Sequence, residues 1–336
     1  MSDIKIGLIG GTGLGDLLRS RAEGERHEVE TPFGRPSDAI VETRWAGLPV
    51  FSISRHGPGH LLNPSQVPYR ANIFALKKLG CTHVIASGAV GSLRDEFKPR
   101  DLVIADQIID KTHKRANTFY DHAAVHVEFA EPFDAVLRRI LIEEGAGKRE
   151  GEVPAEPQST ENSNAGSVGA SPSHGFRVHP RGCYVCMEGP AFSTRAESLM
   201  HRLWGGDLIG MTCMPEAKLA REAEMGYALI ALVTDYDCWR RAGVPTGPGQ
   251  QPPEPPPATD PAVLLKEIIA NLQAASDNAM ALIQRALEGI ARNPDELAAS
   301  PARDALKLAI WSEKSRIPPE QVELLGPLWM RYFGNA

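Results

Sequence analysis

Short apolar runs alternate along this chain with longer segments in which apolar residues recur at helical spacing. The runs that predict strands are residues 4–9, 39–44, 48–54, 82–86, 101–107, 182–187, 208–211 and 227–232. The segments that predict helices are residues 69–79, 134–144, 193–203, 215–224, 260–287 and 303–312. This alternation favours an α/β fold, which we expect to be a single domain with a central mixed, mainly parallel sheet flanked by helices.

The strand predicted at residues 227–232 leads into two carboxylates, Asp235 and Asp237. On an extended chain, residues two apart point to the same side. Ligands of open α/β sheets bind outside the carboxyl ends of the strands. The pair is therefore a candidate for proton transfer or for accepting hydrogen bonds from an amine, although an Asx turn that closes the strand would use the same residues.

Small and polar residues follow other predicted strands as well. Gly10-Gly-Thr-Gly13 follows the first strand and lets backbone N–H groups approach a phosphate, with the Thr12 hydroxyl as a further donor. The turn matches neither the dinucleotide fingerprint nor the P-loop. Arg55 and His56 also follow a strand and offer two donors to an oxyanion, although such pairs are common in surface loops too. A second turn of small residues begins at Ser87.

The composition narrows the class of protein. Among 336 residues, 36 Lys and Arg stand against 42 Asp and Glu, so the net charge is −6. Without a basic run, we expect no nucleic-acid or membrane partner. The sequence predicts no signal peptide, and its apolar stretches fall short of the roughly 20 residues that span a bilayer. The odd number of cysteines, five, indicates reduced thiols and a cytoplasmic location.

Cys183 and Cys186 form a C-x-x-C motif of the kind found in metal knuckles and redox pairs. In the strand predicted at residues 182–187, however, their odd spacing puts the two thiols on opposite faces. The sequence has no second pair to complete a zinc site. We therefore expect no metal.

Three segments differ from the rest of the chain. Residues 146–180 are rich in Gly, Ser, Asn, Pro and Glu, which is typical of a low-complexity insertion. Residues 241–259 are a Pro-rich loop. Residues 291–336 are a C-terminal extension of unknown role, and its end, residues 330–336, looks like a tail. Residues 1–290 are therefore assigned to one domain that carries both insertions.

Six motifs along the chain resemble a known family. They are Gly10-Gly-Thr-Gly13, Thr31-Pro-Phe-Gly-Arg-Pro-Ser-Asp38, Arg55-His-Gly57, Met187-Glu-Gly-Pro-Ala-Phe-Ser-Thr-Arg-Ala-Glu-Ser198, Met211-Thr-Cys-Met-Pro-Glu216 and Thr234-Asp-Tyr-Asp-Cys-Trp239. Together they are similar to the trimeric purine nucleoside phosphorylase family, and its methylthioadenosine phosphorylase branch fits best. The resemblance covers residues 4–289 apart from the two insertions.

The resemblance implies phosphorolysis of 5′-methylthioadenosine to adenine and 5-methylthioribose 1-phosphate, with inorganic phosphate as co-substrate and no cofactor. It assigns phosphate binding to Thr12, Arg55, His56, Gly88, Ala89 and Thr212. It assigns nucleoside contacts to Met211, Phe192, Asp235, Tyr236 and Asp237, and base specificity to Ser193. Asp235 would protonate the leaving base, which requires burial to raise its pKa, and Asp237 would recognise the exocyclic amine. His126 would reach the 5′ pocket of a neighbouring subunit, so the resemblance implies a homotrimer.

The substrate depends on a few positions. Family members that act on 6-oxopurines look to carry Asn where this chain has Asp235, so an adenine-type base is expected. Gly88 stands where the branch looks to have Thr, which removes a donor that Ser87 could replace. Asp260 falls near the expected 5′ group and would suit a hydroxyl better than a methylthio group, unless it is only a helix N-cap. The alternatives are a broader purine nucleoside phosphorylase acting on adenosine, inosine or guanosine, and a non-catalytic nucleotide-binding module.

Overall fold

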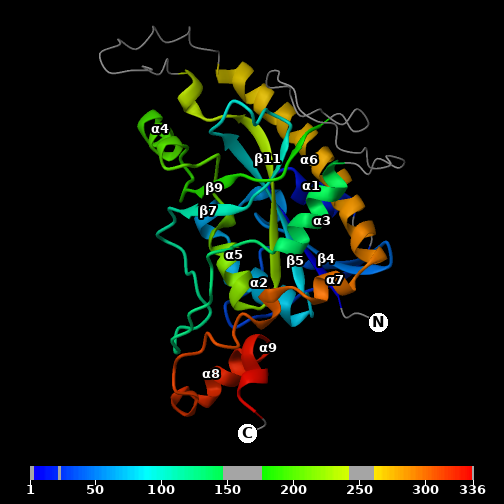
Figure 1. Cartoon of the computed structure of the whole chain (residues 1–336), viewed down its shortest axis with the longest axis vertical. Helices are drawn as coiled ribbons and strands as arrows, with labels where there is room; N and C mark the ends of the chain where they lie inside the picture. The colour runs from blue at the N-terminus through cyan, green and yellow to red at the C-terminus, as the bar shows by residue number, and fades with distance from the viewer. Residues whose placement is uncertain (1–3, 22–23, 147–175, 242–260, 335–336) are drawn as a thin grey trace, which may run out of the picture.

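The computed structural model describes residues 4–21, 24–146, 176–241 and 261–334 (Figure 1). Most of the insertion predicted at residues 146–180, nearly all of the Pro-rich loop at 241–259, and Asp260 lie outside the described residues. None of the described helices has the length and apolar character that crossing a bilayer requires.

The elements occur in nearly the order that the hydrophobic pattern predicts. The strands are β1 (Ile6–Gly10), β2 (Glu25–His27), β3 (Ile40–Trp45), β4 (Leu48–Ser54), β5 (His83–Ser92), β6 (Leu102–Ile104), β7 (Gln107–Asp110), β8 (Val178–His179), β9 (Cys183–Cys186), β10 (Leu208–Gly210) and β11 (Gly226–Tyr236). The α-helices are α1 (Leu14–Arg21), α2 (Tyr69–Lys78), α3 (Ala135–Ala146), α4 (Arg195–Leu203), α5 (Cys213–Glu222), α6 (Pro261–Arg292), α7 (Asp295–Ala298), α8 (Pro319–Leu324) and α9 (Gly326–Trp329).

The described strands form one 11-stranded sheet with helices on both faces (Figure 1). Six of the strand pairs are parallel and four are antiparallel. The predicted fold class, a mixed and mainly parallel sheet flanked by helices, is therefore confirmed. One predicted strand, at residues 101–107, is divided, because β6 pairs with β11 whereas β7 pairs with β9.

The long strand β11 runs parallel to β5 through the centre of the sheet, and its first nine residues are buried. Its even-numbered side chains, Ala228, Ile230 and Leu232, pack with apolar residues of α1, α3 and α6. Its odd-numbered side chains, including Leu229 and Val233, pack with residues of α2 and α5 on the other face. Burial on both faces explains why this strand is a continuous apolar run rather than an alternating one.

The C-terminal extension differs from its prediction. The helix expected at residues 303–312 is wrong: a 3-10 turn at Pro301–Asp304 is followed by further turns. Two backbone donors of this segment bind groups far from it in sequence: the Leu306 N–H donates to Glu224, and the Trp311 N–H donates to the Ala124 carbonyl. These tertiary hydrogen bonds replace the helical pattern, to which propensity contributes only weakly.

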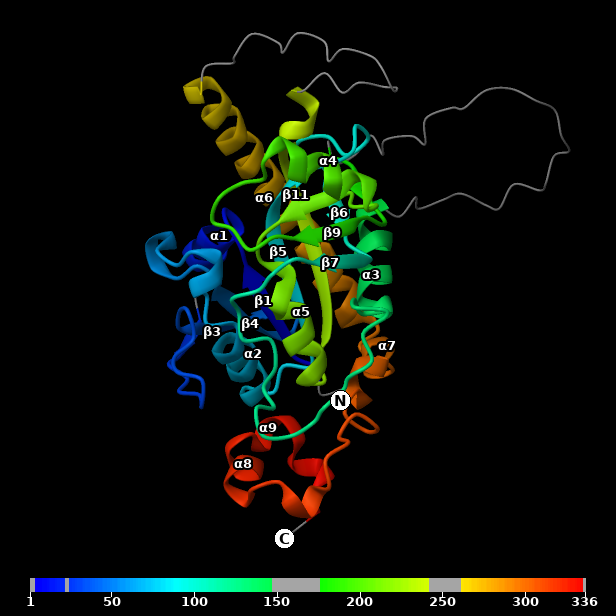
Figure 2. The ribbon, with the colours of Figure 1, turned by 90° about the vertical axis from the view of Figure 1, so that its left-hand side faces the viewer.

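The tail expected at residues 330–336 is also wrong for its described part, residues 330–334. Met330–Tyr332 forms a 3-10 turn, and the Tyr332 hydroxyl donates to Glu224 at 2.6 Å. Trp329, just before it, is fully buried between Tyr120 and Phe333. The extension therefore shares its apolar core with the sheet and α2, at the end of the molecule that carries α8 and α9 (Figure 2).

Candidate active site

The glycine turn after β1 lies against the middle of β5. The Gly11 N–H donates to Ser87 Oγ at 3.2 Å. A Cβ on Gly11 would lie 2.6 Å from the Ser87 carbonyl oxygen and 2.7 Å from Arg55 Nη1, so no larger residue fits there. Gly13 has a φ of +84°, which glycine adopts at little cost. The turn that carries Thr12 is thus held beside Ser87 and Arg55, as the first part of the predicted phosphate site requires.

Arg55 is completely buried at the end of β4. Its Nε and Nη2 donate to the two carboxylate oxygens of Glu216, each at 2.8 Å, and its Nη1 donates to the Ser87 carbonyl at 2.7 Å. Burial opposes the charge of Arg55, but the adjacent Glu216 carboxylate outweighs it and raises the pKa of Arg55 above its ordinary value. A guanidinium carries five N–H donors, so this one is fixed by three of them while keeping its positive charge beside the glycine turn.

His56 follows Arg55 and is nearly buried. Its Nδ1 lies 2.8 Å from the Leu62 carbonyl oxygen, which only accepts, so Nδ1 carries the proton. Burial and the neighbouring Arg55 charge lower the pKa of His56 to about 4. The ring is therefore neutral near pH 7, and its Nε2 is an acceptor. A phosphate that meets Nε2 must donate an O–H to it, whereas the sequence suggested a donor at this position.

Thr212 is another residue to which phosphate binding was assigned. It is buried just before α5, and its side chain makes no capping hydrogen bond to that helix. A Cβ on Gly88 would lie 3.4 Å from Thr212 Oγ1, which is an ordinary contact distance. Thr212 is thus beside Gly88, with Ala89 next along β5. The structure brings together the segments of all six residues to which phosphate binding was assigned.

The two carboxylates meet β5 farther along the same strand. Asp235 is in register with Gly91, just past an irregularity in the β5–β11 ladder. A Cβ on Gly91 would lie 3.4 Å from Asp235 Oδ1 and 3.4 Å from Asp237 Cβ. Gly88 and Gly91 are three residues apart, or roughly 10 Å along a strand. The segments predicted to bind phosphate and the two carboxylates therefore contact the same part of β5, at successive positions along it.

The two carboxylates have different surroundings. Asp235 Oδ2 accepts a hydrogen bond from the Thr234 hydroxyl at 2.7 Å. Asp237 Oδ2 is buried and has no hydrogen-bond partner among the described residues. His201, on α4, also has two buried ring nitrogens without a described partner. An unsatisfied buried acceptor is costly, so a hydrogen bond from a ligand to Asp237 Oδ2 would be favourable.

The segment after β9 borders this end of the site. The side chain of Met211 lies against Gly189, where a Cβ would be 2.5 Å from Met211 Sδ. The Ser193 carbonyl accepts from Cys238 Sγ at 3.4 Å, which places Ser193 beside the end of β11. Phe192 is 85% exposed and is not a core residue in this chain. Their contacts with a nucleoside remain predictions.

Tyr236 and His126 are held by contacts within the chain. The ring of Tyr236 packs on the Arg240 guanidinium, 3.8 Å from its centroid. The ring of His126 lies 4.4 Å from that of Trp311, and its backbone N–H donates to the Ala309 carbonyl. The loop of His126 therefore packs on the C-terminal extension of its own chain, and its contact with a neighbouring subunit remains a prediction.

Sequence reasoning gave no role to two acidic residues within the quoted motifs. Glu216 holds Arg55 and also accepts from the Tyr227 hydroxyl at 2.8 Å. Glu188 accepts from Arg115 Nε at 3.2 Å, and Arg115 also donates to the carbonyl of Met211 at 2.6 Å. Burial opposes the charge of Glu188, but its hydrogen bonds and Arg115 lower its pKa to about 2. Their place in motifs rich in site residues was the only signal available.

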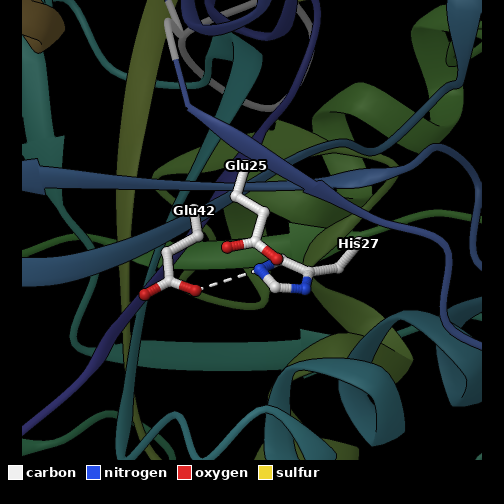
Figure 3. A group of neighbouring side chains, drawn as sticks. All are labelled: Glu25, His27 and Glu42. Carbon is white, nitrogen blue, oxygen red and sulfur yellow. Dashed lines mark hydrogen bonds and ion pairs between the residues drawn. The ribbon is translucent and has the colours of Figure 1, made fainter.

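One group of side chains has the composition of a metal site, away from the site above. Glu25, His27 and Glu42 lie on β2 and β3, with ligand atoms within 4.8 Å of one another (Figure 3). His27 Nε2 lies 3.0 Å from Glu42 Oε2. In the sheet, β2 is at the edge and is separated from β5 by β3, β4 and β1. This group is therefore no part of the candidate active site.

Comparison with known proteins places the chain in a family. The model of the phosphorylase superfamily matches residues 5–288. The S-methyl-5′-thioadenosine phosphorylase of Synechocystis sp. is 40% identical over 100% of this chain and 90% of its own length. A methylthioadenosine phosphorylase from an Antarctic soil metagenomic library has a TM-score of 0.74 at 38% identity, covering 97% of this chain and 98% of that one. The methylthioadenosine phosphorylase of Schistosoma mansoni in complex with adenine has a TM-score of 0.72 at 32% identity, covering 92% and 99%. The chain belongs to the phosphorylase superfamily, in the methylthioadenosine phosphorylase branch of the purine nucleoside phosphorylases.

Proposed function

We propose that this enzyme catalyses the phosphorolysis of 5′-methylthioadenosine to adenine and 5-methylthioribose 1-phosphate. The observation that carries the proposal is the arrangement along β5, where an anion site around Gly88 is followed by two carboxylates at Gly91. One end suits phosphate and the other suits a purine base. The names of the similar proteins and the adenine complex of the Schistosoma mansoni relative support the same substrate.

The reaction exchanges one bond at the anomeric carbon for another. An oxygen of inorganic phosphate bonds to that carbon while the bond to the base nitrogen breaks and its electron pair leaves with the base. Positive charge develops on the ribosyl ring, which the phosphate anion stabilises. The Thr12 and Thr212 hydroxyls hold the anion in place before the reaction, and the buried charge of Arg55 attracts it from behind the glycine turn, so that little reorganisation is needed. Neutral His56 accepts an O–H of a protonated phosphate.

The base leaves more easily when a proton or hydrogen bond reaches its N7. We assign Asp235 to this role as a general acid, in reach of the ligand through its position at Gly91. Asp237 Oδ2, which has no described partner, accepts from the exocyclic amine of adenine. A 6-oxopurine would place a carbonyl oxygen against a carboxylate, which is unfavourable. Adenine-type bases are therefore preferred.

We further propose a homotrimer located in the cytoplasm, with phosphate as co-substrate and no other cofactor. Phe192 and Leu61 are large apolar side chains that are 85% and 82% exposed in the single chain. In a trimer, such side chains are covered by the neighbouring subunit, with His126 at the shared 5′ pocket. The five cysteines, all free, suit a reducing compartment.

The test is release of free base from methylthioadenosine, adenosine, inosine and guanosine, each with and without inorganic phosphate. We expect release only with phosphate, and the highest kcat/KM for methylthioadenosine. Turnover of inosine equal to or above that of methylthioadenosine would establish the broader nucleoside phosphorylase instead. No release from any nucleoside, with tight binding retained, would establish a non-catalytic module.

A further inference from the structure

A cavity of about 240 Å³ lies between the sheet and the C-terminal extension. Thr82 and Glu224 line it from the segments that precede β5 and β11, and Lys77 lines it from the end of α2. Arg303 and residues 326–331 line it from the extension. Figures 1 and 2 show α8 and α9 at this end of the molecule and α4 at the opposite end. The cavity is therefore at the amino ends of β5 and β11, away from the site at their carboxyl ends.

The charges that line this cavity are unbalanced. It is lined by three cations, Lys77, Arg303 and Arg331, and by one anion, Glu224. The Glu224 carboxylate is already satisfied, because it lies 2.8 Å from Arg331 and accepts from the Leu306 N–H at 3.0 Å and the Tyr332 hydroxyl at 2.6 Å. Glu224 and Asp304 thus form ion pairs with Arg331, whereas Lys77 and Arg303 form none among the described residues.

Lys77 and Arg303 have no anionic partner in the described part of the chain. Both side chains are half-buried, and neither makes a described side-chain hydrogen bond or ion pair. Burial lowers the pKa of Lys77; the Glu224 carboxylate opposes this, and the charges of Arg331 and Arg303 each lower it further. Partly desolvated cations that repel one another are costly unless an anion joins them.

We propose that this cavity is a second ligand site, which binds a small oxyanion between the Lys77 ammonium and the Arg303 guanidinium. The cavity is smaller than the roughly 300–1,000 Å³ of sites for drug-sized molecules, so its ligand is an ion or a small metabolite. Guanidinium and ammonium groups bind phosphate and carboxylate through charge-assisted hydrogen bonds. Because Lys77 is on α2 and Arg303 is on the extension, the anion joins the extension to the domain.

The test compares the thermal unfolding of three full-length proteins in increasing sulfate, pyrophosphate or citrate. They are the wild type, the Lys77→Gln/Arg303→Gln double variant, and a Lys78→Gln/Arg316→Gln control. The control removes the same charges from α2 and the extension, at exposed positions that do not line the cavity. All three keep the same active-site residues, so a difference between the two double variants reports on the cavity alone.

We expect at least one anion to raise the Tm of the wild type and the control alike, and the Lys77→Gln/Arg303→Gln variant to need at least tenfold more of it. A response to sulfate and pyrophosphate alone identifies a phosphate-type ligand, and a response to citrate alone identifies a carboxylate. Equal responses of the two double variants to every anion would overturn the proposal.

A second measurement locates the ion directly and does not depend on how the variants fold. Crystals of the wild type grown with selenate should show anomalous density between Lys77 and Arg303, and crystals of the control should show it too. Absence of that density would overturn the proposal. Density that appears at crystallisation concentrations, with no difference between the variants in solution, would mean an adventitious ion only and would also overturn it.

Discussion

Arg55 and Glu216 form a bidentate ion pair, with both N–O distances at 2.8 Å and side chains 0% and 1% exposed. The pair joins the end of β4 to α5 across 161 residues of sequence. Since Arg55 Nη1 also donates to the Ser87 carbonyl, one guanidinium links two strands, β4 and β5, to the helix α5. Arg55, to which phosphate binding is assigned, is thus positioned by a carboxylate that itself has no place in the sequence-based assignment.

Replacing the Glu216 carboxylate should lower the stability of the fold and weaken phosphate binding. In Glu216→Gln, a buried guanidinium loses its counter-charge, which typically costs about 3–5 kcal/mol. We expect a loss of this size in the free energy of unfolding. In the protein that remains folded, we expect the KM for phosphate to increase more than the KM for the nucleoside, relative to the wild type. Chemical denaturation and steady-state kinetics measure the two effects.

The control is Glu143→Gln, which removes the carboxylate of an exposed ion pair with Arg139. Exposed pairs contribute about 0–1 kcal/mol, so its stability and KM should be close to those of the wild type. If the two variants lost equal stability, the Arg55–Glu216 pair would not have the role described above.

Adding a hydroxyl at Gly88 should tighten phosphate binding. A Cβ there meets only Thr212 Oγ1, at the ordinary distance of 3.4 Å, so the position has room for a Cβ, and we expect Gly88→Thr to supply the donor that the resemblance implies at this position. One hydrogen bond to a charged group contributes about 1.5–3 kcal/mol, and we expect the KM for phosphate to fall about tenfold.

The matched control places the same side chain three residues farther along β5. At Gly91, a Cβ would lie 3.3 Å from Ile209 Cγ2 and 3.4 Å from both Asp235 Oδ1 and Asp237 Cβ. Gly91→Thr should therefore impair use of the nucleoside rather than of phosphate. An unchanged phosphate KM in Gly88→Thr would show that the hydroxyl does not reach the anion.

The strand-end residues of this site were predictable, because parallel strands bring their carboxyl ends to one edge wherever they stand in the sequence. Thr12, Arg55 and Asp235 each follow a short apolar run that can be recognised without a structure. Glu216 was not predictable by the same reasoning. It lies within a helix, and only the packing of α5 against the sheet shows that its carboxylate meets Arg55.

The C-terminal extension was mispredicted for a related reason. The apolar residues at 303–312 recur at helical spacing, yet the burial of side chains such as Leu306 and Trp329 depends on the core shared with α2 and Tyr120 rather than on one helix. A pattern along the sequence reports on local periodicity. It does not report a surface that distant segments create, and the tail expected at residues 330–336 is packed because of such a surface.

Replacement of Asp235 should change the base that is accepted. In Asp235→Asn, the amide keeps the size of the side chain but adds N–H donors that suit a 6-oxo group. We expect kcat/KM to fall at least tenfold for methylthioadenosine and to rise for inosine relative to it. The measurement is kcat/KM for both substrates in wild type and variant. A ratio that does not change would mean that Asp235 does not select the base.

Acid should destabilise the enzyme partly through His56. Burial and the charge of Arg55 lower its pKa from 6.5 to about 4 in the folded chain. Between these values the unfolded chain binds a proton that the folded chain does not, so stability is full above pH 6.5 and falls as the pH decreases toward 4. Integration over the interval from pH 7 to pH 5 gives a loss of about 2 kcal/mol from this group.

The measurement is the free energy of unfolding at pH 7 and pH 5 for the wild type and His56→Asn. The difference between the two pH values should be smaller in the variant by about that amount. In the wild type, NMR should show His56 neutral at pH 5 with the proton on Nδ1. A ring that titrates near pH 6.5 would contradict this account and would restore His56 as a donor to phosphate.

The burial of the C-terminal extension can be tested at a single tryptophan. Trp329 is 1% exposed, lies 4.7 Å from the Tyr120 ring, and donates from Nε1 to the Val322 carbonyl at 3.2 Å. Trp329→Ala leaves a large cavity in the shared core, so we expect a loss of about 3–5 kcal/mol in the free energy of unfolding. Trp311→Ala, in the same extension but at a side chain that is 71% exposed, should change it by less than about 1 kcal/mol. If the extension were an independent tail, both substitutions would leave the main unfolding transition unchanged, because neither side chain would then contribute to the core beneath β5 and β11.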